Sequence, residues 1–107
     1  MDTERSAIRV MADYESFPLW RGGVNVDPAG LPLSAGLVDG LLQWADDYDR
    51  TLNRDDPVAS GFADPQAEAA FSARGEELAR GLARELGDGW SVAYFDPRVG
   101  WDVAIGA

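Results

Sequence analysis

Hydrophobic side chains occupy every second position in three segments of the chain, residues 7–14, 90–95 and 101–105. This two-residue period is typical of strands with one buried face. Residues 96–100 read Asp-Pro-Arg-Val-Gly and predict a turn that joins the last two segments into a hairpin. Residues 19–26 predict a short strand or hairpin about Gly22-Gly23.

Two longer segments, residues 35–52 and 66–86, show the 3.6-residue period of amphipathic helices. Ser34 is a favourable N-cap for the first helix. Asp64 followed by Pro65 predicts the start of the second, and a glycine at position 87 predicts its end.

Gly75 falls on the apolar stripe of the second helix, where glycine costs roughly 1 kcal/mol relative to alanine. We therefore expect another element to approach closely there. The element order is strand, short strand, helix, helix, strand, strand. It predicts one α+β domain over residues 1–107, with an antiparallel sheet of three to four strands and two helices packed on one face.

Composition excludes most catalytic chemistry. The 107 residues include no histidine, no cysteine and no lysine, so all nine cations are arginine. Thiolate nucleophiles, imidazole bases and Schiff-base lysines are therefore excluded. A carboxylate-pair enzyme is the remaining catalytic alternative. We expect a protein that is not an enzyme and that needs no cofactor.

The formal net charge of −10 indicates which partners the chain favours. Such a surface repels nucleic-acid backbones and anionic membranes, and it attracts a basic protein. Two alternatives are that the charge only maintains solubility or reflects the composition of the source proteome. The first fifteen residues contain no apolar run resembling a signal peptide, and no stretch is long enough for a membrane helix. Together with the lack of cysteine, this predicts a cytoplasmic protein.

Acidic residues concentrate around the end of the first predicted helix, where the helix dipole disfavours anions. The cluster is Asp46, Asp47, Asp49, Asp55 and Asp56. Counted from Asp47, a calcium loop would need glycine where Leu52 stands, so we predict no metal site. The cluster is either a solvated surface or a docking surface for a basic partner, with a looser metal site of oxygen ligands as a further alternative. Trp44, predicted at the edge of its apolar stripe, would join that surface because an aromatic beside carboxylates can receive an arginine.

A second candidate interface lies in a segment flanked by proline and glycine, where aromatic residues often act as binding anchors. Its residues are Phe17, Leu19 and Trp20. The alternative is that these side chains fill the core.

Three strings of the sequence resemble those of short stand-alone actinobacterial proteins of unassigned function. They are Asp13-Tyr14-Glu15-Ser16-Phe17-Pro18-Leu19-Trp20, Trp44-Ala45-Asp46-Asp47-Tyr48-Asp49 and Gly61-Phe62. In size and acidity the chain also resembles bacterial immunity proteins and antitoxins, which bind and block a basic toxin. This second resemblance implies a class of function and assigns a role to no residue.

The favoured hypothesis is a non-enzymatic, immunity-like or antitoxin-like inhibitor of a basic partner protein such as a toxin. The alternative is a self-associating structural or regulatory module that uses the Phe17–Trp20 segment or an open sheet edge. The protein is expected to be a monomer or a homodimer.

Overall fold

The computed structural model describes residues 6–52, 62 and 64–106 of the chain. Its elements follow one another as β1 (Ser6–Val10), β2 (Leu19–Arg21), β3 (Val24–Val26), a short 3-10 helix (Pro28–Gly30), α1 (Ala35–Asp49), α2 (Pro65–Leu86), β4 (Trp90–Asp96) and β5 (Trp101–Ile105). The α+β class and both predicted helices are confirmed.

The described strands form one five-stranded mixed sheet in the order β3-β2-β1-β4-β5. Strand β1 runs parallel to β4, with Ile8 opposite Val92 and Val10 opposite Tyr94, while the other pairs are antiparallel. The predicted antiparallel sheet of three to four strands is therefore wrong in strand direction and number. The two-residue period reports which face of a strand is buried and carries no information about its direction. The chain returns from β1 to β4 through two helices, a crossover long enough to set the strands parallel.

The predicted first strand is also too long, because β1 ends at Val10 rather than at residue 14. The predicted hairpin about Gly22-Gly23 is confirmed as the connection between β2 and β3. Both glycines have positive φ, 56° and 82°, as a tight two-residue hairpin turn requires.

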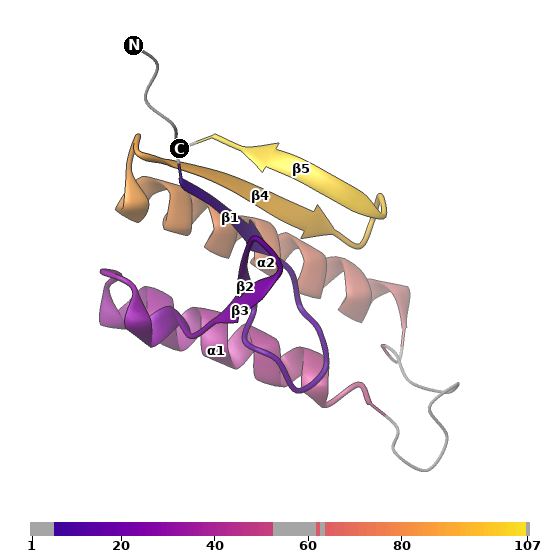
Figure 1. The fold of residues 1–107 in the computed structure, drawn as a ribbon. Helices are drawn as coiled ribbons and strands as arrows, with labels where there is room; N and C mark the ends of the chain where they lie inside the picture. The colour runs from indigo at the N-terminus through magenta and orange to yellow at the C-terminus, as the bar shows by residue number, and fades with distance from the viewer. Residues whose placement is uncertain (1–5, 53–61, 63, 107) are drawn as a thin grey trace.

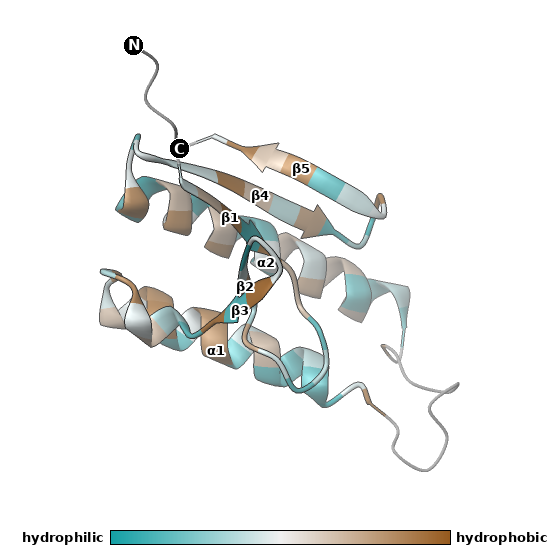
Figure 2. Ribbon diagram, viewed as in Figure 1, coloured by the Kyte–Doolittle hydropathy of each residue, from teal (hydrophilic) through white to brown (hydrophobic). Residues whose placement is uncertain are grey.

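Both helices pack against one face of the sheet, which carries Ile8, Val10, Leu19, Val92 and Tyr94. Figure 1 shows α2 behind β1 and β4, with α1 beside it. Figure 2 shows one strongly hydrophilic position in β5, at Asp102, followed by hydrophobic ones, and all residues of this edge strand except Ile105 are exposed.

The helix ends agree with the capping signals in the sequence. The Ser34 hydroxyl accepts a hydrogen bond from the Leu37 amide, and the Asp64 carboxylate accepts one from the Ala67 amide. Gly87 ends α2 with a φ of 81°. The first helix ends at Asp49, three residues earlier than predicted.

Gly75 lies where α2 crosses the centre of the core, so the predicted close approach is confirmed. A Cβ atom built on Gly75 would lie 2.8 Å from Tyr94 Cζ and would overlap Trp44. The missing side chain therefore allows the two rings to pack against the helix backbone.

Candidate functional site

The predicted acidic cluster lies partly on the last turns of α1. Asp46, Asp47 and Asp49 belong to this helix, whereas Asp55 and Asp56 lie outside the residues that the structure describes. Asp47 accepts hydrogen bonds from Arg50 Nη1 at 2.8 Å and Gln43 Nε2 at 3.1 Å. Its charge is therefore already paired along the helix surface.

Asp49 has a structural role in addition to its charge. Its Oδ1 accepts a hydrogen bond of 2.9 Å from the backbone amide of Glu15. Glu15 has a φ of 58°, a left-handed conformation that costs a non-glycine residue about 1–2 kcal/mol. The bond from Asp49 thus fixes the loop before β2 in a conformation that it would not adopt alone.

Asp46, Asp49 and Glu15 line one concavity, which we call the acidic groove. The groove has a volume of about 470 Å³ and lies between α1 and the loop before β2. Its lining residues are Glu15, Ser16, Phe17, Asn25, Leu42, Ala45, Asp46 and Asp49. No arginine is among them, and Asp46 is exposed without an ion-pair partner among the described residues.

Phe17 belongs to this groove and is 40% exposed. The Asn25 side chain holds its backbone in place, accepting from the Phe17 amide at 2.8 Å and donating to the Phe17 carbonyl at 2.7 Å. The structure therefore joins part of the acidic cluster and part of the second candidate interface into one surface. The sequence predicts them as two separate surfaces.

Three of the predicted interface residues have little surface to offer. Trp44 is 2% exposed and Leu19 is fully buried, so the prediction that Trp44 lies at the edge of its stripe is wrong. Trp20 is half-buried, and its indole Nε1–H donates to the Met11 carbonyl at 3.0 Å. Of the aromatic side chains predicted to contact a partner, Phe17 alone is exposed.

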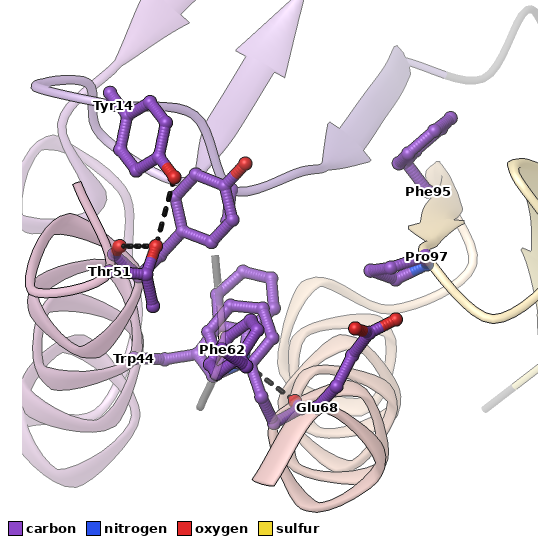
Figure 3. A pocket seen from close by; sticks show the side chains of 10 residues that line it. Tyr14, Trp44, Thr51, Phe62, Glu68, Phe95 and Pro97 are labelled. Atoms are coloured by element: carbon purple, nitrogen blue, oxygen red, sulfur yellow. Dashed lines mark hydrogen bonds between the residues drawn. The ribbon is translucent and has the colours of Figure 1, made fainter. Parts of the chain in front are cut away.

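A second concavity, which we call the aromatic pocket, is not predicted by the sequence. It has a volume of about 280 Å³ and lies past the C-terminal ends of β1 and β4, between the end of α1 and the start of α2. It is lined by Ala12, Tyr14, Trp44, Tyr48, Thr51, Phe62, Glu68, Phe71, Phe95 and Pro97. Figure 3 shows Tyr14 and Thr51 on one side and Glu68 and Pro97 on the other.

Ring contacts order the walls of the aromatic pocket. Tyr14 stacks on Tyr48 with 4.5 Å between centroids, and Phe62 packs on Phe71 at 4.9 Å. The Tyr14 and Thr51 hydroxyl groups form a hydrogen bond of 2.9 Å. These contacts hold the aromatic faces around the opening in fixed positions.

The surroundings of the pocket are electrically negative. Burial, followed by Tyr14, Asp13 and Asp49, raises the pKa of Tyr48, because each disfavours a negative phenolate at that position. Glu68 contributes a carboxylate at the opening. The Asp13, Asp49 and Glu68 carboxylates favour a positive group there, whereas burial disfavours a charge of either sign.

Other site chemistry is not evident in the described parts of the chain. Residues 6–52, 62 and 64–106 contain no group of three or more aspartates or glutamates arranged to hold a metal ion. Neither described helix is long and apolar enough to span a bilayer.

Comparison with known families connects this geometry to a class of protein. Residues 6–97 match the family model described as Serratia CdiI immunity protein-like. The chain belongs to this family. No curated protein matches it significantly.

The family match extends from the first residue of β1 to just beyond β4. It contains all residues that line the acidic groove and the aromatic pocket. Strand β5 lies outside it, so both concavities are formed from the part of the chain that defines family membership.

Proposed function

We propose that this protein is an immunity protein that binds a toxin through the acidic groove and blocks it, and that the contacted toxin surface is basic. Family membership supports the immunity role. The groove supports the choice of surface, because it unites three carboxylates with an exposed aromatic side chain.

Charge gives the groove its selectivity for a basic surface. The whole chain carries a net charge of −10, which accelerates association with a positively charged protein. Asp46, Asp49 and Glu15 supply the local negative potential, and Phe17 supplies apolar area to be buried at the contact. Aromatic anchors of this kind commonly dominate the binding energy of an interface.

The protein acts by binding rather than by catalysis. Carboxylate-pair glycoside hydrolysis needs two carboxyl groups facing each other across the substrate. The aromatic pocket offers one among its lining residues, that of Glu68, and we assign the three carboxylates of the acidic groove to toxin contact. We place this binding in the cytoplasm, since a chain without cysteine suits a reducing compartment.

The test is a binding titration against a candidate toxin domain, sought in the reading frames that neighbour the gene of this protein, combined with survival of cells that produce that toxin. Asp46→Arg introduces a cation into the groove and should lower the association rate at least tenfold, with loss of protection. The matched control is Asp88→Arg, the same charge change at an exposed position after α2. Equal binding by both variants would place the contact outside the groove.

Phe17→Ala separates contact area from charge. Truncation of an exposed anchor should accelerate dissociation of the toxin and leave the association rate nearly unchanged. Thermal unfolding of the free variant should remain close to that of the parent, because Phe17 is 40% exposed.

A specific observation also supports self-association as a second candidate function. Strand β5 is an edge of the sheet, and it exposes 65% of Trp101 and 37% of Val103. Exposed apolar edges are templates for pairing with another strand. If β5 pairs with a second copy, the mass in solution will rise with concentration in the parent and remain monomeric in Trp101→Lys.

A further inference from the structure

The aromatic pocket is a second concavity, and its lining residues Tyr14 and Tyr48 are the chain neighbours of Glu15 and Asp49 in the acidic groove. Its volume of about 280 Å³ is just below the roughly 300–1,000 Å³ of pockets that enclose drug-sized ligands. A space of this size suits one long side chain. Tyr14, Tyr48 and Phe62 are half-buried and form its walls, while Trp44 and Phe71 close its floor.

We propose that the aromatic pocket receives an arginine side chain of the partner protein, with its guanidinium held between aromatic faces and paired with Glu68. This inference rests on the proposed function, since it names the partner group that the pocket would recognise.

Aromatic faces carry negative charge density and attract cations, by about 0.5–2 kcal/mol depending on desolvation. The protein already uses this contact twice: the Arg21 guanidinium lies 4.7 Å from the Trp90 ring centroid, and the Arg9 guanidinium lies 5.2 Å from that of Phe95, so the Phe95 ring is already covered by a cation. A planar guanidinium stacks on rings and accepts carboxylate pairing at its edge, which a compact ammonium does less well.

Glu68 is available for such pairing. It is exposed on the first turn of α2, and its carboxylate has no ion pair or hydrogen bond with another described residue. Arg98 lines a neighbouring hollow together with Glu68, but its guanidinium is bound to Asp96 and Glu76 at 2.7 Å each. In Figure 3 the Glu68 side chain extends toward Pro97.

The helix ends around the pocket favour the same ligand. The C-terminal end of α1, which supplies Tyr48, is the negative end of the helix dipole and favours cations. The N-terminal end of α2 attracts anions, and Glu68 in its first turn offsets that effect. An acidic ligand would be repelled by Glu68, and a neutral polar one would gain neither an ion pair with Glu68 nor the attraction of a cation to the rings.

The experiment uses a peptide rather than a toxin, so it tests the pocket independently of the immunity role. The full-length protein is titrated with acetyl-Gly-Arg-Gly-amide, and the neutral isostere acetyl-Gly-citrulline-Gly-amide serves as the control ligand. Nuclear magnetic resonance follows the four tryptophan indole signals and the backbone amides. Because the Trp44 indole donates to the Phe71 carbonyl at the pocket floor, its signal reports occupancy.

We expect saturable millimolar binding of the arginine peptide, with shifts concentrated at the Trp44 indole and the amides of Tyr14, Thr51 and Glu68. Glu68→Gln should weaken this binding about fivefold, the effect of losing one partly exposed ion pair. The control Glu77→Gln, an exposed position further along α2, should leave it unchanged.

Three results would overturn the inference: equal binding of the citrulline peptide, shifts confined to the acidic groove, or equal affinity of the parent and Glu68→Gln. Each leaves the proposed function intact, since toxin binding through Asp46 is measured separately. Conversely, a chain that binds the peptide and no toxin would refute the immunity role and retain the pocket.

Discussion

The Trp44 and Phe71 rings stack with 4.6 Å between their centroids and planes 10° apart, and the Trp44 indole donates a 2.9 Å hydrogen bond to the Phe71 carbonyl. This pair joins α1 to α2 at the centre of the core. It is also the floor of the aromatic pocket. Stability and the shape of the candidate site therefore depend on the same contact.

Trp44→Ala should destabilise the protein by about 3–5 kcal/mol, as much as Phe71→Ala, because both side chains are buried. The free energy of unfolding in urea measures this. Trp101→Ala is the control, since that ring is 65% exposed and its loss should change stability by about 0.5 kcal/mol or less. A Trp44→Ala variant nearly as stable as the parent would contradict the burial of Trp44 and favour the position at the stripe edge that the sequence predicts.

Two glycines of α2 should respond in opposite directions to alanine. Gly75→Ala should destabilise by about 1–3 kcal/mol because its Cβ meets the rigid rings of Trp44 and Tyr94. Gly81→Ala should stabilise by up to about 1 kcal/mol, since its Cβ would lie at an ordinary 3.5 Å from Leu37 Cδ1. Melting temperatures of the two variants give the comparison, and equal shifts would contradict the close packing at Gly75.

Acid should destabilise the fold through the ion-pair network around Arg98. Hydrogen bonds from Arg98 lower the pKa of Asp96 from its usual 3.8, and bonds from Arg80 and Arg98 lower the pKa of Glu76 from its usual 4.5. A carboxyl group whose pKa is lower in the folded state stabilises the fold while ionised. That contribution is present above the unfolded pKa and is lost as the pH falls through the folded value.

The melting temperature should therefore decline below about pH 4.5, the usual pKa of a glutamate. Asp96→Asn and Glu76→Gln should each reduce the decline, whereas Glu77→Gln, whose side chain is 70% exposed, should not. An identical pH profile for Asp96→Asn and the parent would show that the network contributes nothing.

Replacing Asp49 by alanine should lower the free energy of unfolding, whereas replacing Asp47 should not, although both residues are near the C-terminal end of α1. Removal of either anion should favour the helix by about 0.3–1 kcal/mol. For Asp49→Ala the loss of the hydrogen bond to the Glu15 amide, about 1.5–3 kcal/mol for a charged acceptor, exceeds that gain. Asp47→Ala loses an exposed pair with Arg50 worth about 0–1 kcal/mol, so its net effect is near zero. Urea unfolding of both variants tests the difference, and a stable Asp49→Ala would mean that the loop holds Glu15 by other contacts.

The sequence by itself determined the helices, their caps and the faces that they bury. Ser34, Asp64 and Gly87 act through hydrogen bonds and backbone angles within a few residues, so local chemistry is sufficient to place them. Gly75 was identifiable for a similar reason, because a glycine on an apolar helical stripe has a cost that packing must offset.

The tertiary structure alone decided the direction of β1, since alternation is identical in parallel and antiparallel strands. It also decided the positions of Ala12 and Tyr14. Their alternation predicts a continuing strand, but both residues follow the end of β1 and line the aromatic pocket. The helical spacing places Trp44 at the edge of the apolar stripe of α1. Its side chain is buried because Phe71 of α2 and Tyr94 of β4 pack against it.

The candidate site divides in the same way. Asp46, Asp49 and Phe17 could be identified individually, because charge clusters and aromatic residues in loops are visible in a sequence. Their union in the acidic groove depends on the contact between Asp49 and Glu15, which are 34 residues apart. The aromatic pocket depends on side chains from residue 12 to residue 97. Local patterns show which residues are charged, aromatic or buried. Contacts between distant segments decide which of these side chains lie together in one site.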